Sequence, residues 1–317
     1  MQISLVTPAG KGSRGGNRTS AVRWADILRS FGHQVRVATE YAEEPADVMV
    51  ALHAWRSASS IEKFHRLYPR RPLVVALTGT DIYGFIHSEP ATTLRSLDLA
   101  HALVGLHALV ADAIPQRYHG KLEIIYQSAV PLRRPRPRRR HSFDVLVIGH
   151  LREEKDPLRA AEAARLLPQI SRMRVIHFGR AHEQHWAERA QAEMARNPRY
   201  IWRGEAPRWQ VRRAMAGAAL MVLSSRLEGG ANVISEAVMA GLPVIASEIA
   251  GSIGLLGETY PGYYPVGDSA ALARLMLRTE EEKGYLDDLR RHCVERRPLF
   301  RPARERQSWR KLLMRLA

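Results

Sequence analysis

Two glutamates spaced by seven residues, Glu228 and Glu236, frame the stretch of this chain that is best suited to chemistry. Gly229 and Gly230 follow the first glutamate, and the second lies inside a helix predicted over residues 231–240. Glycine lets the backbone pass close to a ligand, and a helix start presents free N–H groups and a positive dipole end to an anion. Glu236 sits among apolar residues and needs a hydrogen-bonding partner, which a diol such as a ribose would supply. The stretch therefore predicts an anion site beside a sugar site.

Cations follow a second buried strand, which we predict over residues 143–148. The loop after it carries His150, Arg152 and Lys155, and we expect Asp156 to cap a helix that runs through residue 167. Arg152, Lys155 and the helix start at Gly229 can together hold a diphosphate. The chain has no D-x-D triplet, so we expect no metal and no other cofactor. The cations and the helix dipole would stabilise a diphosphate leaving group unaided.

A basic, glycine-rich loop over residues 7–18 follows the first predicted strand, residues 3–6, and precedes a helix that ends near residue 31. Such a loop can cradle an anion. It is neither G-x-G-x-x-G nor a Walker A sequence, so it predicts neither dinucleotide nor ATP binding, and the alternative interpretation is a mobile surface loop. The residues that we assign to an acceptor anion are Lys11, Ser13, Arg14, Gly15, Gly16 and Arg18, and the catalytic candidates in the loop are Arg14, Gly15, Gly16, Asn17 and Arg18.

Polar residues also end the strands predicted over residues 46–53 and 72–77, namely His53, Thr80 and Asp81. The carboxyl edge of a parallel sheet is where ligands bind, so these residues are catalytic candidates for orienting the acceptor or the sugar. His53 could instead make a structural hydrogen bond, and Asp81 could cap a helix or stabilise a turn. Gln127 and Ser128, after a strand over residues 122–126, are candidates for a ligand contact or for a hinge.

Strands and helices alternate along the whole chain, which predicts an α/β protein with two doubly wound parallel sheets. We expect an N-terminal domain over residues 1–130, a stiff Pro/Arg-rich linker over 131–142 and a C-terminal domain over 143–300. The tail, 301–317, predicts an amphipathic helix with Trp309, Leu312, Leu313 and Leu316 on one side, packing back on the N-terminal domain. Two such domains suggest a cleft between their sheets.

The composition and the net charge of the chain limit the classes of ligand that it is expected to bind. The net charge is +16, with only six lysines among 48 basic residues, so anions such as nucleotides, phosphates or acidic membranes are expected ligands. Nucleic acid is not expected, since aromatic residues are not interleaved with the arginines. No apolar run approaches the ~20 residues of a membrane span, and the first residues do not resemble a signal peptide. With Cys293 alone, neither a disulfide framework nor a cysteine zinc site forms, and we expect a cytoplasmic protein without stable membrane insertion.

Two motifs resemble those of the large family 4 of glycosyltransferases, which have the GT-B fold of two Rossmann-like domains facing a cleft. Gly149-His150-Leu151 with Lys155 is similar to that family's diphosphate motif, and residues 228–247 resemble its E-x7-E segment. The resemblance implies that Glu228 lies by the donor sugar, that Gly229 and Gly230 contact sugar and diphosphate, and that Glu236 holds the ribose. His150 departs from the family's arginine, and Arg152 is a candidate replacement. The donor-binding residues expected on this basis are His150, Arg152, Lys155, Glu228, Gly229, Gly230, Ala231, Asn232, Val233 and Glu236; Glu228 is also a catalytic candidate.

A narrower resemblance covers both domains and includes the loop sequence GSRGGNR over residues 12–18. The segments ALHAWRSA, VVALTGTDIY, GHLREEKDPLRAA and SRLEGGANV are likewise similar to the selenosugar synthases of selenoneine biosynthesis. This resemblance implies coupling of selenophosphate to a UDP-sugar, typically UDP-N-acetylglucosamine, to give a 1-seleno sugar. A selenophosphate acceptor is a small polyanion that is already nucleophilic, so it needs cations and backbone amides more than a strong general base.

Three alternatives remain at this point. The first is an ordinary family 4 glycosyltransferase with a sugar or lipid acceptor, docked through basic helices on anionic lipid. The second is a nucleotide-sugar epimerase, against which the E-x7-E segment argues. The third is a non-enzymatic protein that binds anions or nucleic acid, which rests on charge alone.

Overall fold

The structure is a computed structural model that describes residues 1–132 and 142–316. The chain divides into two compact units. Unit 1 comprises Met1–Ser128, Glu228–Asn232 and Leu299–Ala317, and unit 2 comprises Ala129–Leu227 and Val233–Pro298. The short segment Glu228–Asn232 thus belongs to unit 1, although its neighbours on both sides along the chain belong to unit 2. The linker predicted over residues 131–142 lies outside the described residues except at its two ends.

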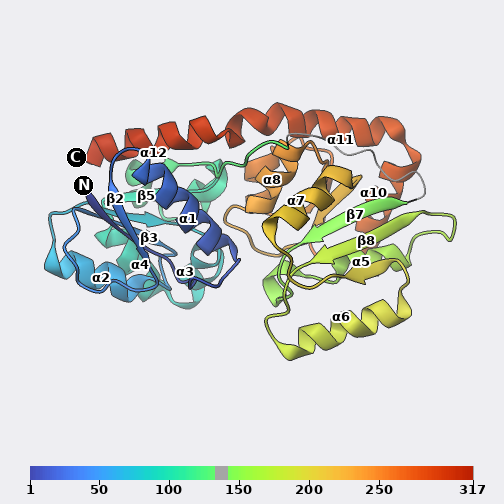
Figure 1. Cartoon of the computed structure of the whole chain (residues 1–317), viewed down its shortest axis with the longest axis horizontal. Coiled ribbons are helices and arrows are strands. Elements are labelled where there is room, and N and C mark those ends of the chain that lie inside the picture. Colours follow the sequence, from blue (N-terminus) through green and yellow to red (C-terminus); the bar gives the residue numbers. More distant parts are fainter. Residues whose placement is uncertain (133–141, 317) are drawn as a thin grey trace. The chain divides into compact units, whose positions relative to one another are not determined.

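Unit 1, whose first 128 residues run from blue to green in Figure 1, is built on a sheet of six parallel strands. The order of the strands is β2-β1-β3-β4-β5-β6. The strands are β1 (Gln2–Val6), β2 (Gln34–Ala38), β3 (Val48–Leu52), β4 (Leu73–Ala76), β5 (Ala102–Gly105) and β6 (Leu122–Ile124). The helices are α1 (Gly16–Arg29), α2 (Ala58–Leu67), α3 (Ile86–Ser88), α4 (Pro90–Leu99) and α12 (Pro302–Leu316), with a π-helical turn at Asp81–Phe85 and 3₁₀ segments at Ala108–Ala113 and Gln116–Lys121. All residues of β3 and β4 are buried, as expected for central parallel strands that are covered on both faces.

Helices cover both faces of this sheet. On one face Trp24 of α1 and Trp309 of α12 are fully buried and pack edge to face, with ring centroids 4.9 Å apart. Such an aromatic pair adds about 0.5–1.5 kcal/mol beyond the burial of its area. On the other face Phe64 of α2 and Leu97 of α4 enter a second core. The last helix of the chain is therefore part of the core of unit 1.

Unit 2 has a second sheet of six parallel strands, in the order β12-β11-β10-β7-β8-β9. The strands are β7 (Phe143–Ile148), β8 (Met173–Phe178), β9 (Tyr200–Trp202), β10 (Leu220–Leu223), β11 (Val244–Ser247) and β12 (Tyr263–Tyr264). The helices are α5 (Arg159–Arg165), α6 (Gln184–Arg196), α7 (Arg208–Gly217), α8 (Asn232–Ala240), α9 (Ala250–Leu256), α10 (Ser269–Glu281) and α11 (Lys283–Arg296), with 3₁₀ segments at Glu153–Lys155 and Arg297–Phe300. Helices α5 and α10 pack together, and Arg159 joins them by donating to Ser269 Oγ at 2.7 Å. Each unit thus has the doubly wound α/β architecture that the sequence predicts.

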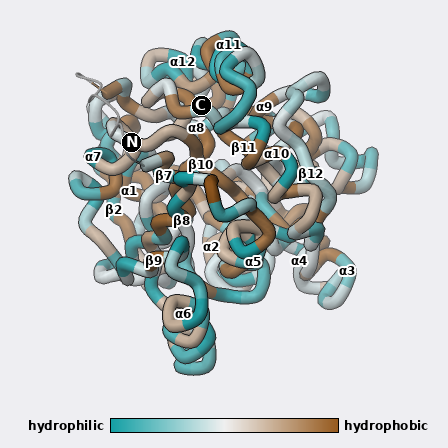
Figure 2. The backbone as a smooth tube through the Cα atoms, turned by 90° about the vertical axis from the view of Figure 1, so that its right-hand side faces the viewer, coloured by the Kyte–Doolittle hydropathy of each residue, from teal (hydrophilic) through white to brown (hydrophobic). Residues whose placement is uncertain are grey.

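The hydropathy of the chain follows this layering. Figure 2 shows hydrophobic residues along β10 and β11, whereas α6 is largely hydrophilic. Its buried residues are Trp186, Ala190 and Glu193. Among the described residues, no helix is both long enough and apolar enough to span a membrane.

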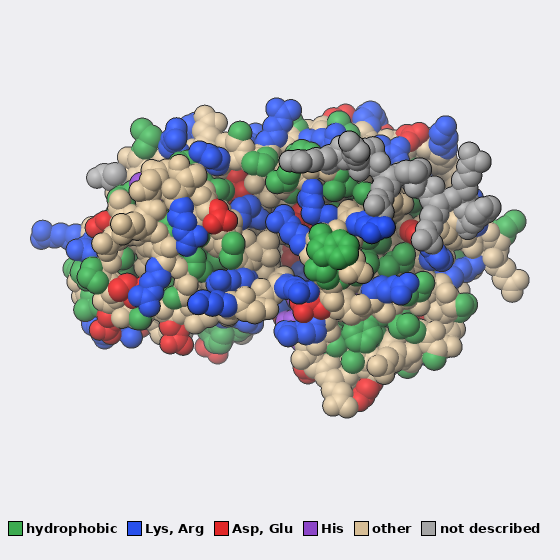
Figure 3. All heavy atoms as spheres, in the orientation of Figure 1, with side chains coloured by type: hydrophobic (Ala, Val, Ile, Leu, Met, Phe, Trp, Pro, Cys, Tyr) green, Lys and Arg blue, Asp and Glu red, His purple; other side chains and the backbone are tan. Residues whose placement is uncertain are grey.

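Basic side chains are widely distributed over the surface. On the face in Figure 3, Lys and Arg side chains lie over both units, interspersed with acidic and hydrophobic ones. Many arginines are engaged in local ion pairs, such as Arg29 with Asp26 and Arg278 with Glu282. Exposed pairs of this kind contribute at most about 1 kcal/mol each.

Candidate active site

The loop after β7 forms one wall of a small hollow in unit 2. The hollow is open to solvent, and its lining comprises Val147, Ile148, Gly149, His150, Lys155, Pro157, His177, Val222, Leu223, Ser224 and Ser225. Ser224 follows β10, and its hydroxyl donates to the backbone oxygens of Lys155 at 3.1 Å and Asp156 at 2.8 Å. The carboxyl ends of β7 and β10 therefore place Lys155 at this hollow, and its role as a diphosphate-binding cation stays a prediction.

His150 is held as a neutral ring. Its Nδ1 accepts the backbone N–H of Arg180 at 3.1 Å, and its ring lies 5.0 Å from that of His182. Burial and, to a smaller extent, the neighbouring His182 together lower the pKa of His150 to about 4. His150 therefore carries no positive charge at neutral pH, and it cannot supply the charge of the arginine that it replaces. Arg152 lies close by, with its Nε 3.8 Å from Glu154.

The predicted cap at Asp156 is wrong. Helix α5 begins only at Arg159, after Leu158 at the N-cap position, and Asp156 has a left-handed backbone with φ of 43°. Its carboxylate instead accepts from the Arg159 guanidinium at 2.8 Å. The ion pair stabilises the turn that carries Lys155, so Asp156 shapes the loop rather than starting the helix.

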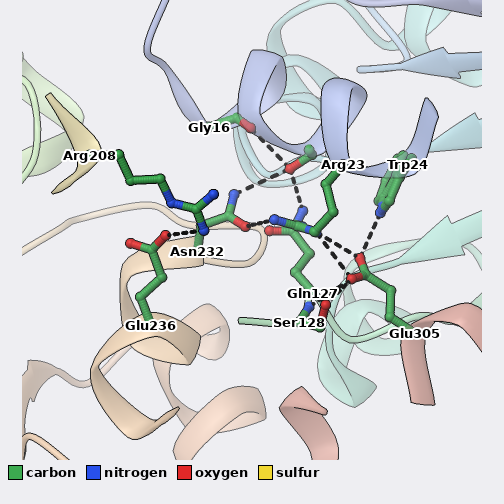
Figure 4. Close-up of polar contacts among 10 residues, drawn as sticks. Gly16, Arg23, Trp24, Gln127, Ser128, Arg208, Asn232, Glu236 and Glu305 are labelled. Carbon is green, nitrogen blue, oxygen red and sulfur yellow. Dashed lines mark hydrogen bonds and ion pairs between the residues drawn. The ribbon is translucent and has the colours of Figure 1, made fainter. Parts of the chain in front are cut away.

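Glu236 lies one turn into α8. Its side chain is 16% exposed, and it accepts from Nη2 of Arg208 at 3.2 Å (Figure 4). Arg208 begins α7, and its side chain is 60% exposed. The hydrogen-bonding partner that the apolar surroundings of Glu236 require is thus an exposed arginine. Nothing in the sequence indicated Arg208, because it precedes Glu236 by 28 residues on another helix.

The segment Glu228–Asn232 makes very close backbone contacts within unit 1. A side chain at position 229 would collide with the backbone of Thr78 and Gly79, and one at 230 would collide with Leu106. Gly79 itself has φ of 123°, a conformation that favours glycine. Glycine is therefore required at 229 and 230 for packing, whether or not a ligand approaches them.

The ten predicted donor-binding residues do not all fall in one unit. Those in unit 1 are Glu228, Gly229, Gly230, Ala231 and Asn232, and those in unit 2 are His150, Arg152, Lys155, Val233 and Glu236. The first turn of α8 contains the change from one unit to the other. Sequence spacing alone could not show this division, because the residues on both sides of it are consecutive.

The basic loop of unit 1 leads directly into α1. Gly15 occupies the N-cap position without a side-chain cap, and its N–H donates to Ser13 Oγ at 3.1 Å. Arg14 and Lys11 are exposed, and Arg18 is half-buried in the first turn of the helix together with Asn17. In the described part of the chain, no acidic side chain forms an ion pair with Lys11, Arg14 or Arg18. The predicted anion site is therefore a helix start with three cations near it in the sequence.

Asp81 is wholly buried at the carboxyl edge of the sheet in unit 1. Its carboxylate accepts backbone N–H groups from four residues at 2.7–3.2 Å, namely Ala54, Thr78, Gly79 and Ile82. These bonds occupy both oxygens, and they join the loop after β3 to the loop after β4. Asp81 thus organises this edge through the backbone.

His53 is fixed beside it with positive φ, 77°. Its Nδ1 accepts the N–H of Arg56 at 3.1 Å, so Nε2 carries the proton and donates to Thr80 Oγ1 at 2.9 Å. Burial lowers the pKa of His53, although the charge of Asp81 opposes the shift. The structure brings His53, Thr80 and Asp81 together as predicted, but it uses the basic atoms of His53 and Asp81 in internal hydrogen bonds.

Two aromatic rings that the sequence analysis did not predict as site residues also lie at the carboxyl edge of the sheet in unit 1. Trp55 and Phe85 are half-buried and stack face to face, with centroids 4.0 Å apart and planes 1° apart, and Phe85 also lies 5.8 Å from His53. The sequence does not show that these two rings stack, because Trp55 follows β3 and Phe85 follows β4. Elsewhere, the described residues contain no group of three His, Cys, Asp or Glu side chains that could hold a metal ion.

Comparisons with known proteins show the family and the fold of the chain. The family model "Glycosyl transferases group 1" matches residues 132–298, more than half of the chain, and the chain belongs to this family. No curated protein sequence matches it. Similar solved structures include Anabaena HepE in complex with UDP-glucose, at 17% identity over 99% of each chain with a TM-score of 0.77. Sucrose-phosphate synthase from Thermosynechococcus elongatus is 16% identical over 99% of this chain and 98% of its own, also with a TM-score of 0.77. A glycosyltransferase from Rickettsia africae is 13% identical over 99% and 98%, with a TM-score of 0.71. The predicted GT-B fold is confirmed, and the protein is a glycosyltransferase.

Proposed function

We propose that the protein transfers a sugar from a UDP-sugar, with UDP-N-acetylglucosamine as the donor. The family supports transfer, and HepE has been solved with UDP and with UDP-glucose. We propose that Glu236 accepts hydrogen bonds from the ribose hydroxyls in exchange for Arg208, which is its partner in the structure. Lys155 and Arg152 supply positive charge for the diphosphate, and the glycines of the 228–232 segment face the transferred sugar.

As the acceptor we propose selenophosphate. The observation that carries this proposal is the state of His53 and Asp81, whose basic atoms are already engaged with backbone N–H groups. A sugar hydroxyl must lose a proton during transfer, whereas the selenium of selenophosphate is already anionic and needs no general base. Arg14 and Arg18 beside the start of α1 provide the charge that such a small polyanion requires.

The proposed reaction has two steps. The selenium donates an electron pair to the anomeric carbon, the bond from that carbon to the UDP oxygen breaks, and UDP leaves with the bonding electrons. Water then attacks phosphorus, and the P–Se bond breaks with its electrons remaining on selenium. The products are a 1-seleno sugar, UDP and phosphate, and we propose that the cations and helix dipoles assist without a metal ion.

A second candidate is transfer to a sugar acceptor, because Trp55 and Phe85 form an aromatic surface at the carboxyl edge of unit 1. Aromatic faces bind the apolar faces of sugar rings. This candidate requires a base other than His53 in its present tautomer. We rank it second for that reason.

Incubation of the protein with UDP-N-acetylglucosamine and selenophosphate tests the proposal directly. Mass spectrometry should detect a sugar with the isotope pattern of selenium, and UDP release should depend on selenophosphate and persist in EDTA. UDP release that is equally fast without selenophosphate, or that requires a sugar acceptor, would reject selenophosphate as the acceptor. Loss of activity in EDTA that Mg²⁺ restores would reject the metal-free mechanism.

Two variants separate the acceptor half from the donor half. Arg14→Ala should raise the KM for selenophosphate about tenfold, since a charge-assisted contact to an anion contributes roughly 1.5 kcal/mol. Arg66→Ala, an exposed change on α2, is the matched control. Glu236→Gln should weaken UDP binding about tenfold by calorimetry, and Glu188→Gln on the polar helix α6 should not. An unchanged acceptor KM in Arg14→Ala would show that the basic loop is not the acceptor site.

A further inference from the structure

A buried carboxylate on the last helix joins distant segments of unit 1. Glu305 of α12 has no exposed side-chain surface, and both of its oxygens accept from Nε of Arg23 at 3.1 Å (Figure 4). Oε1 also accepts from Trp24 Nε1 at 2.8 Å, and Oε2 accepts from the backbone N–H of Ser128 at 3.0 Å and from its hydroxyl. The buried charge is thus compensated by an opposite charge and by further donors, as burial of a carboxylate requires.

The arginine of this pair extends the network to the segment Glu228–Asn232. Nη1 of Arg23 donates to Asn232 Oδ1 at 3.0 Å, and Asn232 Nδ2 donates to Ser20 Oγ at 3.2 Å. A guanidinium is planar and rigid, so fixing Nε against Glu305 also fixes the direction of Nη1. The arrangement sets the position of the Asn232 amide at both its oxygen and its nitrogen.

Ser20 completes the network from the side of α1. Its hydroxyl donates to the backbone oxygen of Gly16 at 3.0 Å and accepts from Gln127 Nε2 at 2.8 Å. All of these residues belong to unit 1. Three parts of unit 1 therefore help to fix the position of Asn232. They are the beginning of α1, residues 127–128 and helix α12.

Asn232 is the last residue of a short segment that is clamped at both ends. At the other end, Gly229 is packed against the backbone of Thr78 and Gly79 so closely that no side chain fits. Between these two points lie only Gly230 and Ala231. A shift of the Asn232 anchor would therefore be transmitted to the glycines of the segment.

We infer that Arg23 and Glu305 are positioning residues for sugar transfer, which act through Asn232 on the segment that carries Glu228 and Gly229. This inference rests on the proposed function of that segment at the transferred sugar. Neither residue contacts substrate in this scheme. Their loss should lower kcat, because transfer depends on the placement of the reacting sugar, while UDP affinity should persist because Glu236 and Lys155 lie outside the network.

A double-mutant cycle tests this. Arg23→Lys retains the charge but cannot bridge Glu305 and Asn232, and Asn232→Ala removes the anchor without disturbing the buried pair. We expect each variant to lower kcat at least tenfold, Arg23→Lys to leave the Kd for UDP unchanged within twofold, and the double variant to be no slower than the slower single variant. Arg29→Lys, the same change at an exposed position of α1, should match the wild type. Multiplicative losses in the double variant, or an unchanged kcat in Arg23→Lys, would overturn the inference.

Hydrogen exchange provides a measurement that needs no substrate. Peptides covering residues 228–236 should exchange faster in Arg23→Lys and Glu305→Gln than in the wild type or Arg29→Lys, while peptides from β7 and β8 keep their rates. If the wild type transfers no sugar from any UDP-sugar, the proposed function fails, and exchange still decides whether the network holds the segment. Unchanged exchange would overturn the inference, and so would faster exchange with an unchanged kcat.

Discussion

Each of the two units holds a candidate carboxylate, and the two carboxylates are held in opposite ways. In unit 1, Asp81 is wholly buried and accepts from four backbone N–H groups. In unit 2, Glu236 is 16% exposed and accepts from one arginine that is 60% exposed. Backbone donors cannot leave without unfolding the loops that carry them, whereas an exposed arginine can be replaced at a cost of at most about 1 kcal/mol.

The difference is the basis of the different tasks that we propose for the two edges. The edge of unit 1 is preorganised, and the basic atoms of His53 and Asp81 there are already engaged by backbone N–H groups. The edge of unit 2 has a hydrogen-bonding acceptor whose partner can be exchanged for a ligand. This contrast is why we assign acceptor chemistry without a general base to unit 1 and nucleotide binding to unit 2.

The largest expected effect is on stability. It comes from Asp81→Asn, which disturbs the backbone hydrogen bonds at the carboxyl edge of unit 1. The amide retains the shape of the carboxylate, but its NH2 group would face backbone N–H groups and leave buried donors unpaired. We expect the free energy of unfolding to fall by about 3 kcal/mol, measured by urea titration followed by hydrogen exchange in peptides from residues 74–86.

Asp112→Asn is the matched control, because Asp112 is exposed in the same unit. Its stability should stay within about 0.5 kcal/mol of the wild type. If Asp81→Asn is equally mild, the four backbone bonds are weak and the contrast between the two edges fails.

The second largest expected effect is the pH dependence of stability that arises from His177. It tests whether unit 2 also contains a buried polar group that internal hydrogen bonds hold in place. His177 is fully buried beneath the loop after β7, with Nδ1 2.9 Å from Tyr200 Oη and Nε2 donating to the Gly149 oxygen at 3.0 Å. Burial, opposed by the hydrogen bond to the Gly149 carbonyl and assisted by His150, lowers the pKa of His177 to about 4. Between pH 6.5 and 4 the unfolded chain therefore binds a proton that the folded chain does not, so stability falls as the pH falls through this range.

From pH 7 to pH 5 this residue should account for a loss of about 2 kcal/mol in the free energy of unfolding. His177→Gln should remove that part of the pH dependence, whereas His185→Gln, at a half-exposed side chain, should retain it. Urea titrations at the two pH values measure the difference. Identical pH dependence in His177→Gln and the wild type would mean that His177 accepts a proton in the folded state.

Local sequence patterns were sufficient for the fold. The apolar run predicted β7 over its full extent, and the helix predicted over residues 231–240 ends at the same residue as α8. The spacing of apolar residues and the residues that end a helix are local features of the sequence, so they can be recognised without the structure. The division of the chain into two units within the first turn of α8 could not be predicted in this way, because it depends on contacts between segments that are distant in sequence.

The candidate site shows the same limit. The sequence placed His53, Thr80 and Asp81 at one sheet edge but did not identify their partners, which are backbone N–H groups for His53 Nδ1 and Asp81 and the His53 ring for Thr80. Glu305 left a signal that was missed: it stands four residues before Trp309, on the apolar side of the tail helix. A charged residue on such a face must find a partner inside the protein, and that rule predicts the buried pair although it does not identify Arg23.

The smallest expected effect addresses the exchangeable partner directly. If ribose replaces Arg208 at Glu236, then Arg208→Gln removes a competitor and should strengthen UDP binding by at most about fivefold, as an exposed ion pair contributes up to about 1 kcal/mol. Arg213→Gln, an exposed change on the same helix α7, controls for the loss of positive charge near the site. Calorimetry with UDP at low salt measures both. Weaker binding in Arg208→Gln alone would mean that the arginine contacts the nucleotide, and the edge of unit 2 would then also be preformed rather than exchangeable.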